Sequence, residues 1–119
     1  MSADTLLEAG RLLGALEPVG ATDATVHYVV SGTPDGKLQV GVEIAGGHVD
    51  SITEGKPTDP DIVVTLAYDV VCSLLEGEAT ADAAYMRGAV KVEGAHAVWL
   101  LELRDLRTAA LEALAGLLD

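Results

Sequence analysis

The sequence predicts an α+β fold in which five strands form a mostly antiparallel sheet and the helices pack on one of its faces. Apolar residues recur at helical spacing near both ends of the chain, whereas across the middle they alternate with polar residues. Glycine-containing turns separate the alternating segments, as expected of strands that follow one another in a sheet. At 119 residues the chain is predicted to be a single domain, residues 1–119.

The first predicted element is a helix within the stretch "ADTLLEAGRLLGALE", which begins at residue 3. Its apolar face consists of Leu6, Ala9, Leu13 and Leu16. Pro18 and Gly20 follow and are predicted to end the helix. The helix is therefore expected to lie on the sheet through one face.

Three consecutive strands are predicted between residues 24 and 54, where the apolar period changes to two. One face of the first two strands carries Val26, Tyr28, Val30, Leu38, Val40, Val42 and Ile44. The stretch "GTPDGK" joins these strands as a hairpin turn, and Gly46-Gly47 makes a second tight turn into "HVDSITE". Strands joined by such short turns form an antiparallel meander.

The second half of the chain is predicted to alternate strands with short helices. "DIVVTL" is expected to be the fourth strand, and "AVKVEG" the fifth, with Val90 and Val92 inward. The helices between them are expected to end at Gly77 and Gly88, and Thr80 is predicted to cap the second of these helices.

The tail "AHAVWLLELRDLRTAALEALAGLLD" is predicted to be helical. Its apolar stripe is formed by Leu103, Leu106, Ala110, Leu114 and Leu117. The stripe is expected to lie across the rest of the domain.

The composition argues against several classes of function. A net charge of −12 would repel nucleic acid and anionic membrane surfaces, so neither is predicted as a partner. No apolar run approaches the ~20 residues of a membrane-spanning helix, and stable membrane insertion is not expected. The acidic start "MSADTLLEAG" lacks the character of a signal peptide, which favours a cytoplasmic location. Cys72 lies in an apolar stretch and is expected to fill space rather than to react.

Residues 61–103 resemble the carboxy-terminal half of the sterol carrier protein type-2 family. The matching features are an acidic residue that opens a strand, a Leu-Leu-x-Gly helix end, an Ala-aromatic-Met-x-Gly helix end, a Val-Lys-Val-x-Gly strand and a leucine-rich close. In this chain they correspond to Asp61, Leu74, Leu75, Gly77, Ala84 to Gly88, Val90 to Gly94, Leu100, Leu101 and Leu103. The amino-terminal half matches in element order more than in letters.

The resemblance implies that the sheet and helices enclose an apolar cavity for a fatty acid, acyl-CoA, sterol or similar lipid, without enzymatic activity and without a cofactor. The residues expected to bind such a ligand are Val40, Val42, Ile44, Leu74, Leu75, Tyr85, Met86, Val90, Trp99 and Leu103, with Tyr85 as a polar handle. A filled core would require the same apolar residues, so the sequence alone does not distinguish a filled core from a ligand cavity.

The chain contains no phenylalanine, so aromatic lining could come only from Tyr28, Tyr68, Tyr85 and Trp99. A flat sterol would therefore meet mainly aliphatic walls. This departure from the family weakens a specific prediction of sterol as the ligand.

Two further hypotheses remain beside the lipid carrier. His48 and Asp50 share a strand face with Ile52, and if this face pointed inward they could act as acid and base on a lipid or polyketide-like substrate. Alternatively, the domain could dimerise or bind a partner enzyme through its carboxy-terminal helix, in which case the stripe from Leu106 to Leu117 would be partly exposed. No metal site is predicted, because His27, His48 and His96 lie far apart in the sequence.

Overall fold

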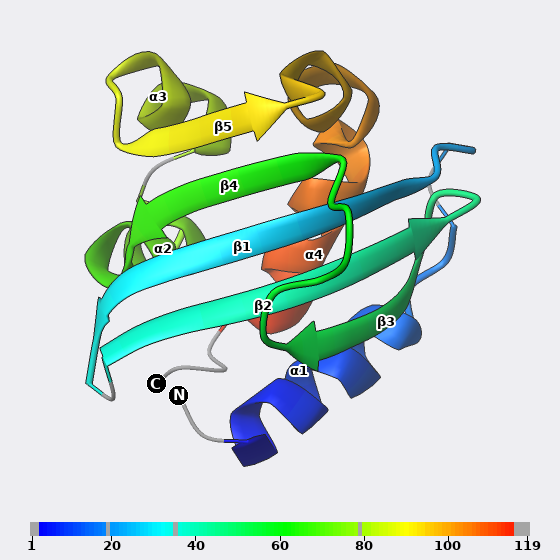
Figure 1. Cartoon of the computed structure of the whole chain (residues 1–119), viewed down its shortest axis with the longest axis horizontal. Helices are drawn as coiled ribbons and strands as arrows, with labels where there is room; N and C mark the ends of the chain where they lie inside the picture. The colour runs from blue at the N-terminus through cyan, green and yellow to red at the C-terminus, as the bar shows by residue number, and fades with distance from the viewer. Residues whose placement is uncertain (1–2, 19, 35, 79, 116–119) are drawn as a thin grey trace.

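The chain folds into one five-stranded sheet with helices behind it (Figure 1). The computed structural model describes residues 3–18, 20–34, 36–78 and 80–115, and of residues 3–6 and 81 it describes only the backbone. The strands are β1 (Ala24–Thr33), β2 (Gly36–Ala45), β3 (His48–Glu54), β4 (Ile62–Ala67) and β5 (Val90–Gly94). The helices are α1 (Ala3–Gly14), α2 (Tyr68–Leu75), α3 (Ala81–Met86), the π-helical turn η1 (Val98–Glu102) and α4 (Arg104–Leu114).

The strand order is β3-β2-β1-β4-β5. The pairs β1–β2, β2–β3 and β4–β5 are antiparallel, and β1–β4 is parallel. The predicted mostly antiparallel sheet and the predicted meander of the first three strands are therefore confirmed. Figure 1 shows α1, α2 and α4 behind the sheet, and α3 beside the edge strand β5.

The parallel pairing is made possible by the connection from β3 to β4, which crosses the front of the sheet in Figure 1 and brings β4 beside β1. Asp61 lies where this connection ends. Its backbone N–H donates to the carbonyl of Thr25 at 2.9 Å, and its side chain accepts from the Thr25 N–H at 2.9 Å. Its carbonyl accepts from Ala95 just after β5 at 3.0 Å, so Asp61 joins the starts of β1 and β4 to the end of β5.

The two predicted helix ends after α2 and α3 are confirmed. Gly77 and Gly88 have φ of 77° and 80°, the left-handed conformation that glycine adopts without steric cost. The predicted cap of α3 is confirmed as well, because the Thr80 hydroxyl accepts from the Ala83 N–H at 3.1 Å. The chain can therefore leave α3 abruptly and enter β5.

The helical tail predicted at the carboxy-terminal end consists of two parts, and the first of them is the π-helical turn η1. There the N–H of Leu103 donates to the carbonyl of Val98, five residues back, at 2.9 Å. Regular α-helix resumes only with α4. The predicted stripe positions Leu103 and Leu106 are buried, and Leu117 lies outside the described residues.

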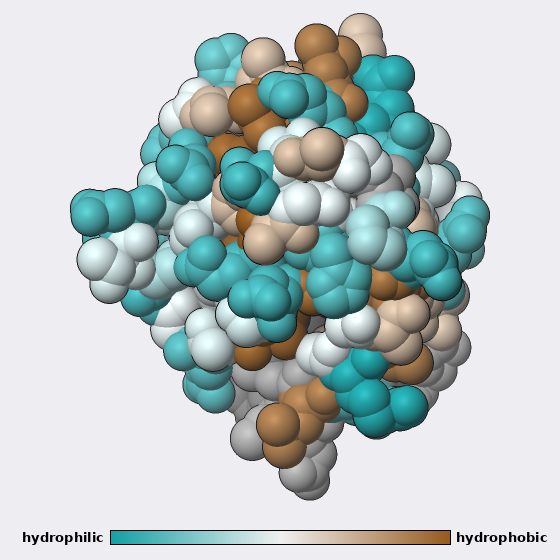
Figure 2. All heavy atoms as spheres, turned by 90° about the vertical axis from the view of Figure 1, so that its right-hand side faces the viewer, coloured by the Kyte–Doolittle hydropathy of each residue, from teal (hydrophilic) through white to brown (hydrophobic). Residues whose placement is uncertain are grey.

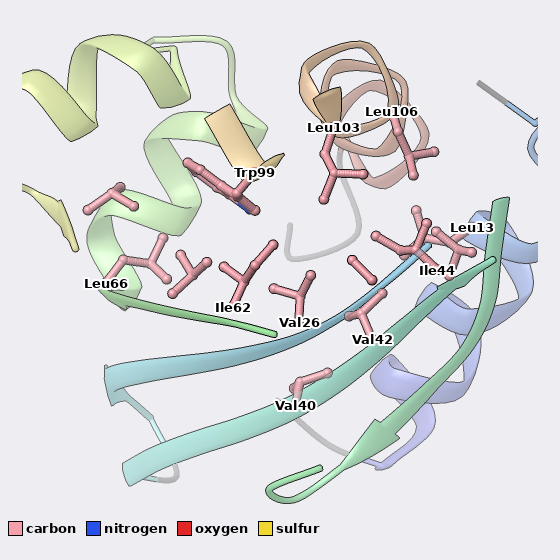
Figure 3. Close-up of a cluster of buried hydrophobic side chains, with 14 of the residues drawn as sticks. Leu13, Val26, Val40, Val42, Ile44, Ile62, Leu66, Trp99, Leu103 and Leu106 are labelled. Carbon is pink, nitrogen blue, oxygen red and sulfur yellow. The ribbon is translucent and has the colours of Figure 1, made fainter. Parts of the chain in front are cut away.

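The core lies between the inner face of the sheet and the helices (Figure 3). Alternate residues of the central strands, such as Val26, Val42 and Ile62, point from the sheet toward Trp99 and Leu103 in the helical layer. The predicted inward face of β1 and β2 is thus the core face.

On the surface shown in Figure 2, hydrophilic residues are widespread and hydrophobic residues appear between them in several separate areas. None of the helices that the structure describes has the length and apolar character of a membrane span. Within the described ranges, no three His, Cys, Asp or Glu side chains gather in a way that could hold a metal ion.

Candidate functional site

A cavity of about 230 Å³ lies between the inner face of the sheet and the helices. Every strand and the helices α1, α2 and α4 contribute to its wall, and nearly all of that wall is hydrocarbon. The lining residues are Ala9, Leu13, Tyr28, Val30, Leu38, Val40, Val42, Ile44, Val49, Ile52, Val64, Leu66, Val71, Leu74, Leu75, Val90, Trp99, Leu103, Leu106, Arg107, Ala110, Leu111 and Leu114.

The composition of the two layers explains why space remains between them. The sheet presents mainly valine and the helices present leucine and alanine, in a chain that has no phenylalanine to fill a wide gap. Where the layers meet more closely, Val26 and Ile62 are fully buried and do not line the cavity. The inner face of the sheet therefore borders a filled core in one part and the cavity in another. The apolar pattern of the sequence corresponds to a core in the first part and to a cavity wall in the second.

Most of the residues predicted to bind a ligand lie around this cavity. Those that line it are Val40, Val42, Ile44, Leu74, Leu75, Val90, Trp99 and Leu103. Tyr85 and Met86 do not, and Met86 is 89 % exposed. The reason is that α3 lies beside the edge strand β5, where it buries Ala84, and none of its described side chains lines the cavity. The prediction of Tyr85 as polar handle of the cavity is therefore corrected.

The predicted pairing of His48 with Asp50 inside the cavity is also wrong. A shift in register between β2 and β3 pairs Glu43 with Ser51 but Ile44 with Val49, which breaks the simple alternation along β3. As a result Val49 and Ile52 both line the cavity, while Asp50 is exposed. The His48 ring instead donates from Nε2 to the carbonyl of Gly14 at 2.9 Å, tying β3 to the end of α1.

The polar part of the cavity wall consists of Tyr28, Trp99 and Arg107, referred to below as the polar triad. The indole Nε1 of Trp99 donates to the Tyr28 hydroxyl at 3.1 Å. The Arg107 guanidinium lies over the Trp99 ring, with its central carbon 4.1 Å from the ring centroid, a favourable cation–π geometry. The triad thus joins β1, η1 and α4.

The π-helical turn explains why Arg107 is held so firmly. The backbone hydrogen bonds at this junction run from Leu103 to Val98 and from Arg107 to Leu103. The carbonyls of Trp99 and Leu100 accept instead from the Arg107 side chain, from Nε at 2.8 Å and from Nη2 at 3.2 Å. Arginine commonly satisfies carbonyls at helix ends in this way.

Burial sets the titration behaviour of the triad. It raises the pKa of the Tyr28 phenol, although the hydrogen bond from Trp99 and the charge of Arg107 act in the opposite direction. Burial also lowers the pKa of the Arg107 guanidinium, opposed by Tyr28 and Asp82. The ordinary pKa values of both groups lie well above neutral pH, so the phenol is neutral and the guanidinium is charged there.

The sequence analysis missed Arg107 as a lining residue, although a signal was present. Arg107 lies four residues after Leu103 and three before Ala110, so helical spacing places it on the predicted apolar stripe. Arginine on such a stripe is usually expected to reach solvent. Here its side chain is only 11 % exposed.

The described part of the carboxy-terminal stripe is used inside the domain. Leu103 and Leu106 are buried, and Leu106, Ala110 and Leu114 line the cavity. In the part of the chain that the structure covers, this stripe therefore forms part of the cavity wall.

The fold closely matches solved sterol carrier proteins. A crystal structure of sterol carrier protein 2 superposes with a TM-score of 0.79 at 14 % identity, covering 97 % of this chain and 96 % of the other. The solution structure of palmitated SCP2L2 from Aedes aegypti gives 0.69 at 20 % identity, over 89 % of this chain and 94 % of the other. The conserved hypothetical protein TT1886 from Thermus thermophilus gives 0.72 at 13 % identity, over 98 % and 87 %.

A search of curated proteins finds no match to this chain. The model of one protein family, described as the SCP-2 sterol transfer family, matches residues 4–101. This span includes all five strands and the helices α2 and α3, and it agrees with the resemblance seen in the sequence. The chain therefore belongs to the SCP-2 sterol transfer family.

Proposed function

We propose that this protein is a non-enzymatic lipid carrier that holds the aliphatic part of a fatty acid, acyl-CoA, sterol or similar ligand in the cavity behind its sheet. The observation that carries the proposal is the cavity itself, whose wall is hydrocarbon on almost every side. A wall that adds to hydrocarbon only a phenol, an indole and a guanidinium favours binding over chemistry.

Membership of a sterol transfer family supports the proposal, as does the structural match to a protein solved in palmitated form. Together these features favour a lipid carrier over a protein that acts on nucleic acid.

The size of the cavity favours a single acyl chain. Its volume is about 230 Å³. This lies below the roughly 300–1,000 Å³ that pockets for larger ligands occupy. Each methylene group that enters contributes about 0.8 kcal/mol, or a roughly fourfold gain in affinity.

The test is a titration of the protein with saturated fatty acids of increasing chain length, followed by calorimetry. We expect the affinity to rise roughly fourfold per methylene and then to level off once the chain outgrows the cavity. Absence of uptake at every chain length, in protein stripped of co-purified lipid, would contradict the proposal.

A matched pair of variants on α4 shows where the chain binds. Ala110 lines the cavity, so Ala110→Trp should occupy it and lower the affinity at least tenfold while the protein stays folded. Glu112 is exposed on the same helix, and Glu112→Trp should leave the affinity unchanged. Equal affinities of the two variants would place the ligand elsewhere.

A further inference from the structure

The cavity of this strongly acidic protein contains a buried cation. The chain has a net charge of −12, yet the charged residue in the cavity wall is Arg107. A charged side chain among hydrocarbon is costly unless its donors are satisfied. The donors of Arg107 that the protein itself does not use therefore indicate which ligand groups it could bind.

The guanidinium of Arg107 has five N–H groups, and the fold uses only part of them. Nε and Nη2 donate to the carbonyls of Trp99 and Leu100. Within the described residues, the structure gives the remaining nitrogen, Nη1, no hydrogen-bond partner. The two carbonyls thus fix the guanidinium in place, and the N–H groups of Nη1 remain available to donate to a ligand.

The charges around Arg107 do not cancel. Asp82 of α3 lies 3.6 Å from Arg107 Nη2, but it is shared with Arg104, at 3.4 Å. Two cations and one carboxylate leave one positive charge, and Asp82 Oδ1 is buried without a hydrogen bond. A ligand with one negative charge would balance this cluster.

Tyr28 also lines the cavity and adds a second donor next to Trp99, the ring over which Arg107 lies. Its hydroxyl oxygen accepts from Trp99, so the phenolic proton is available to donate. No hydrogen bond from this proton is present among the described residues. A phenol and a guanidinium together match the two oxygens of a carboxylate.

We propose that Tyr28 and Arg107 form a buried head-group site that selects single-chain lipids ending in a carboxylate, with the acid inside the cavity at the polar triad. This inference rests on the proposed carrier function and narrows its ligand to a fatty acid. Arg107 lies beyond residues 4–101, so the match to the family model does not include it. The proposal makes Arg107 the residue that determines the preference for the head group.

The experiment compares decanoic acid with 1-decanol, which share the chain length and differ in the head group. Titrated into the unmodified protein at about pH 7.5, the acid should bind at least tenfold more tightly than the alcohol. Equal binding of both would overturn the head-group site while leaving the carrier function standing. Failure of both to bind would overturn the two proposals together.

Variants then assign the preference to Arg107. Arg107→Gln should reduce the preference for the acid over 1-decanol to about twofold or less. Arg107→Lys keeps the charge and should restore part of the preference. Tyr28→Phe should lower it by a smaller factor, since it removes one neutral donor.

Arg104→Gln is the matched control. Arg104 shares Asp82 with Arg107, but it does not line the cavity and its side chain is 52 % exposed. This variant should keep the full preference for the acid. If Arg104→Gln and Arg107→Gln lose it equally, general electrostatic attraction explains the preference and the specific site is wrong.

Discussion

The two faces of the sheet differ in how closely they are packed. On the inner face, Val40, Val42 and Val64 line the cavity. In a filled core, further side chains would occupy this space. On the outer face, the connection between β3 and β4 lies directly on the strands, and the ring of Pro57 comes within 3.1 Å of the point where Gly41 would carry a Cβ. The same strands thus keep one side open and the other closely packed.

Polar contacts strengthen this contrast. On the outer side, the His27 ring donates to the Gln39 side chain at 3.0 Å, and the Thr25 hydroxyl donates to Glu43 at 2.9 Å. Both pairs link β1 to β2. The outer face therefore stabilises the sheet through specific hydrogen bonds. The inner face makes apolar contacts around the cavity, which a bound hydrocarbon chain could also make.

The largest expected effect comes from placing a charge on the inner face. Val64 is fully buried, and Val64→Asp should cost about 3–5 kcal/mol or more, enough to unfold much of the protein. Its neighbour Thr65 faces the other way and is exposed, so Thr65→Asp should cost less than about 1 kcal/mol. Urea denaturation of both variants measures the difference, and similar costs would mean that the two faces are not distinct.

An intermediate effect is expected from adding volume to the outer face. Gly41→Val should destabilise the protein by about 1–3 kcal/mol, because Pro57 leaves no room for the branched side chain. On the inner face, Val42→Ile adds a methyl group beside the cavity and should change the stability by less than about 1 kcal/mol. A Gly41→Val protein as stable as the original would show that the β3–β4 connection yields easily.

The smallest effect is expected at an exposed ion pair on β5. Lys91 Nζ lies 3.4 Å from Glu93, and both side chains are more than half exposed. Because water screens such pairs, Lys91→Gln should change the free energy of unfolding by less than about 0.5 kcal/mol. A larger loss that shrinks when salt is added would indicate that the outer face depends on charge as well as on packing.

The fold was largely predictable, because its signals are local. The alternation around Val40 and Val42 predicted the inner face of β2, and Gly77 and Gly88 predicted where two helices end. Parallel pairing of β1 with β4 depends on a connection that crosses the sheet, which no local pattern specifies. The π-helical turn before α4 was missed for a similar reason, since Leu103 fits an α-helical stripe as well as it fits the observed turn.

The residues that line the candidate site were predictable, but the existence and size of the cavity were not. Aliphatic residues such as Leu74 and Val90 line the cavity as expected, but whether facing side chains meet or leave a gap depends on the spacing of the layers. A bulge in the β2–β3 pairing put Val49 inside and left Asp50 outside, against strict alternation. Arg107 was missed because its role depends on two carbonyls freed by the π-helical turn.

The position of α4 in the chain has a consequence for biosynthesis. This helix completes the cavity wall, it follows all five strands, and it packs against α1 from the beginning of the chain. Contacts between segments so far apart in sequence form late and slow the folding of a domain. On the ribosome, the part of the inner face that α4 covers is therefore exposed until α4 has been translated, which is a stage at which apolar surface favours aggregation.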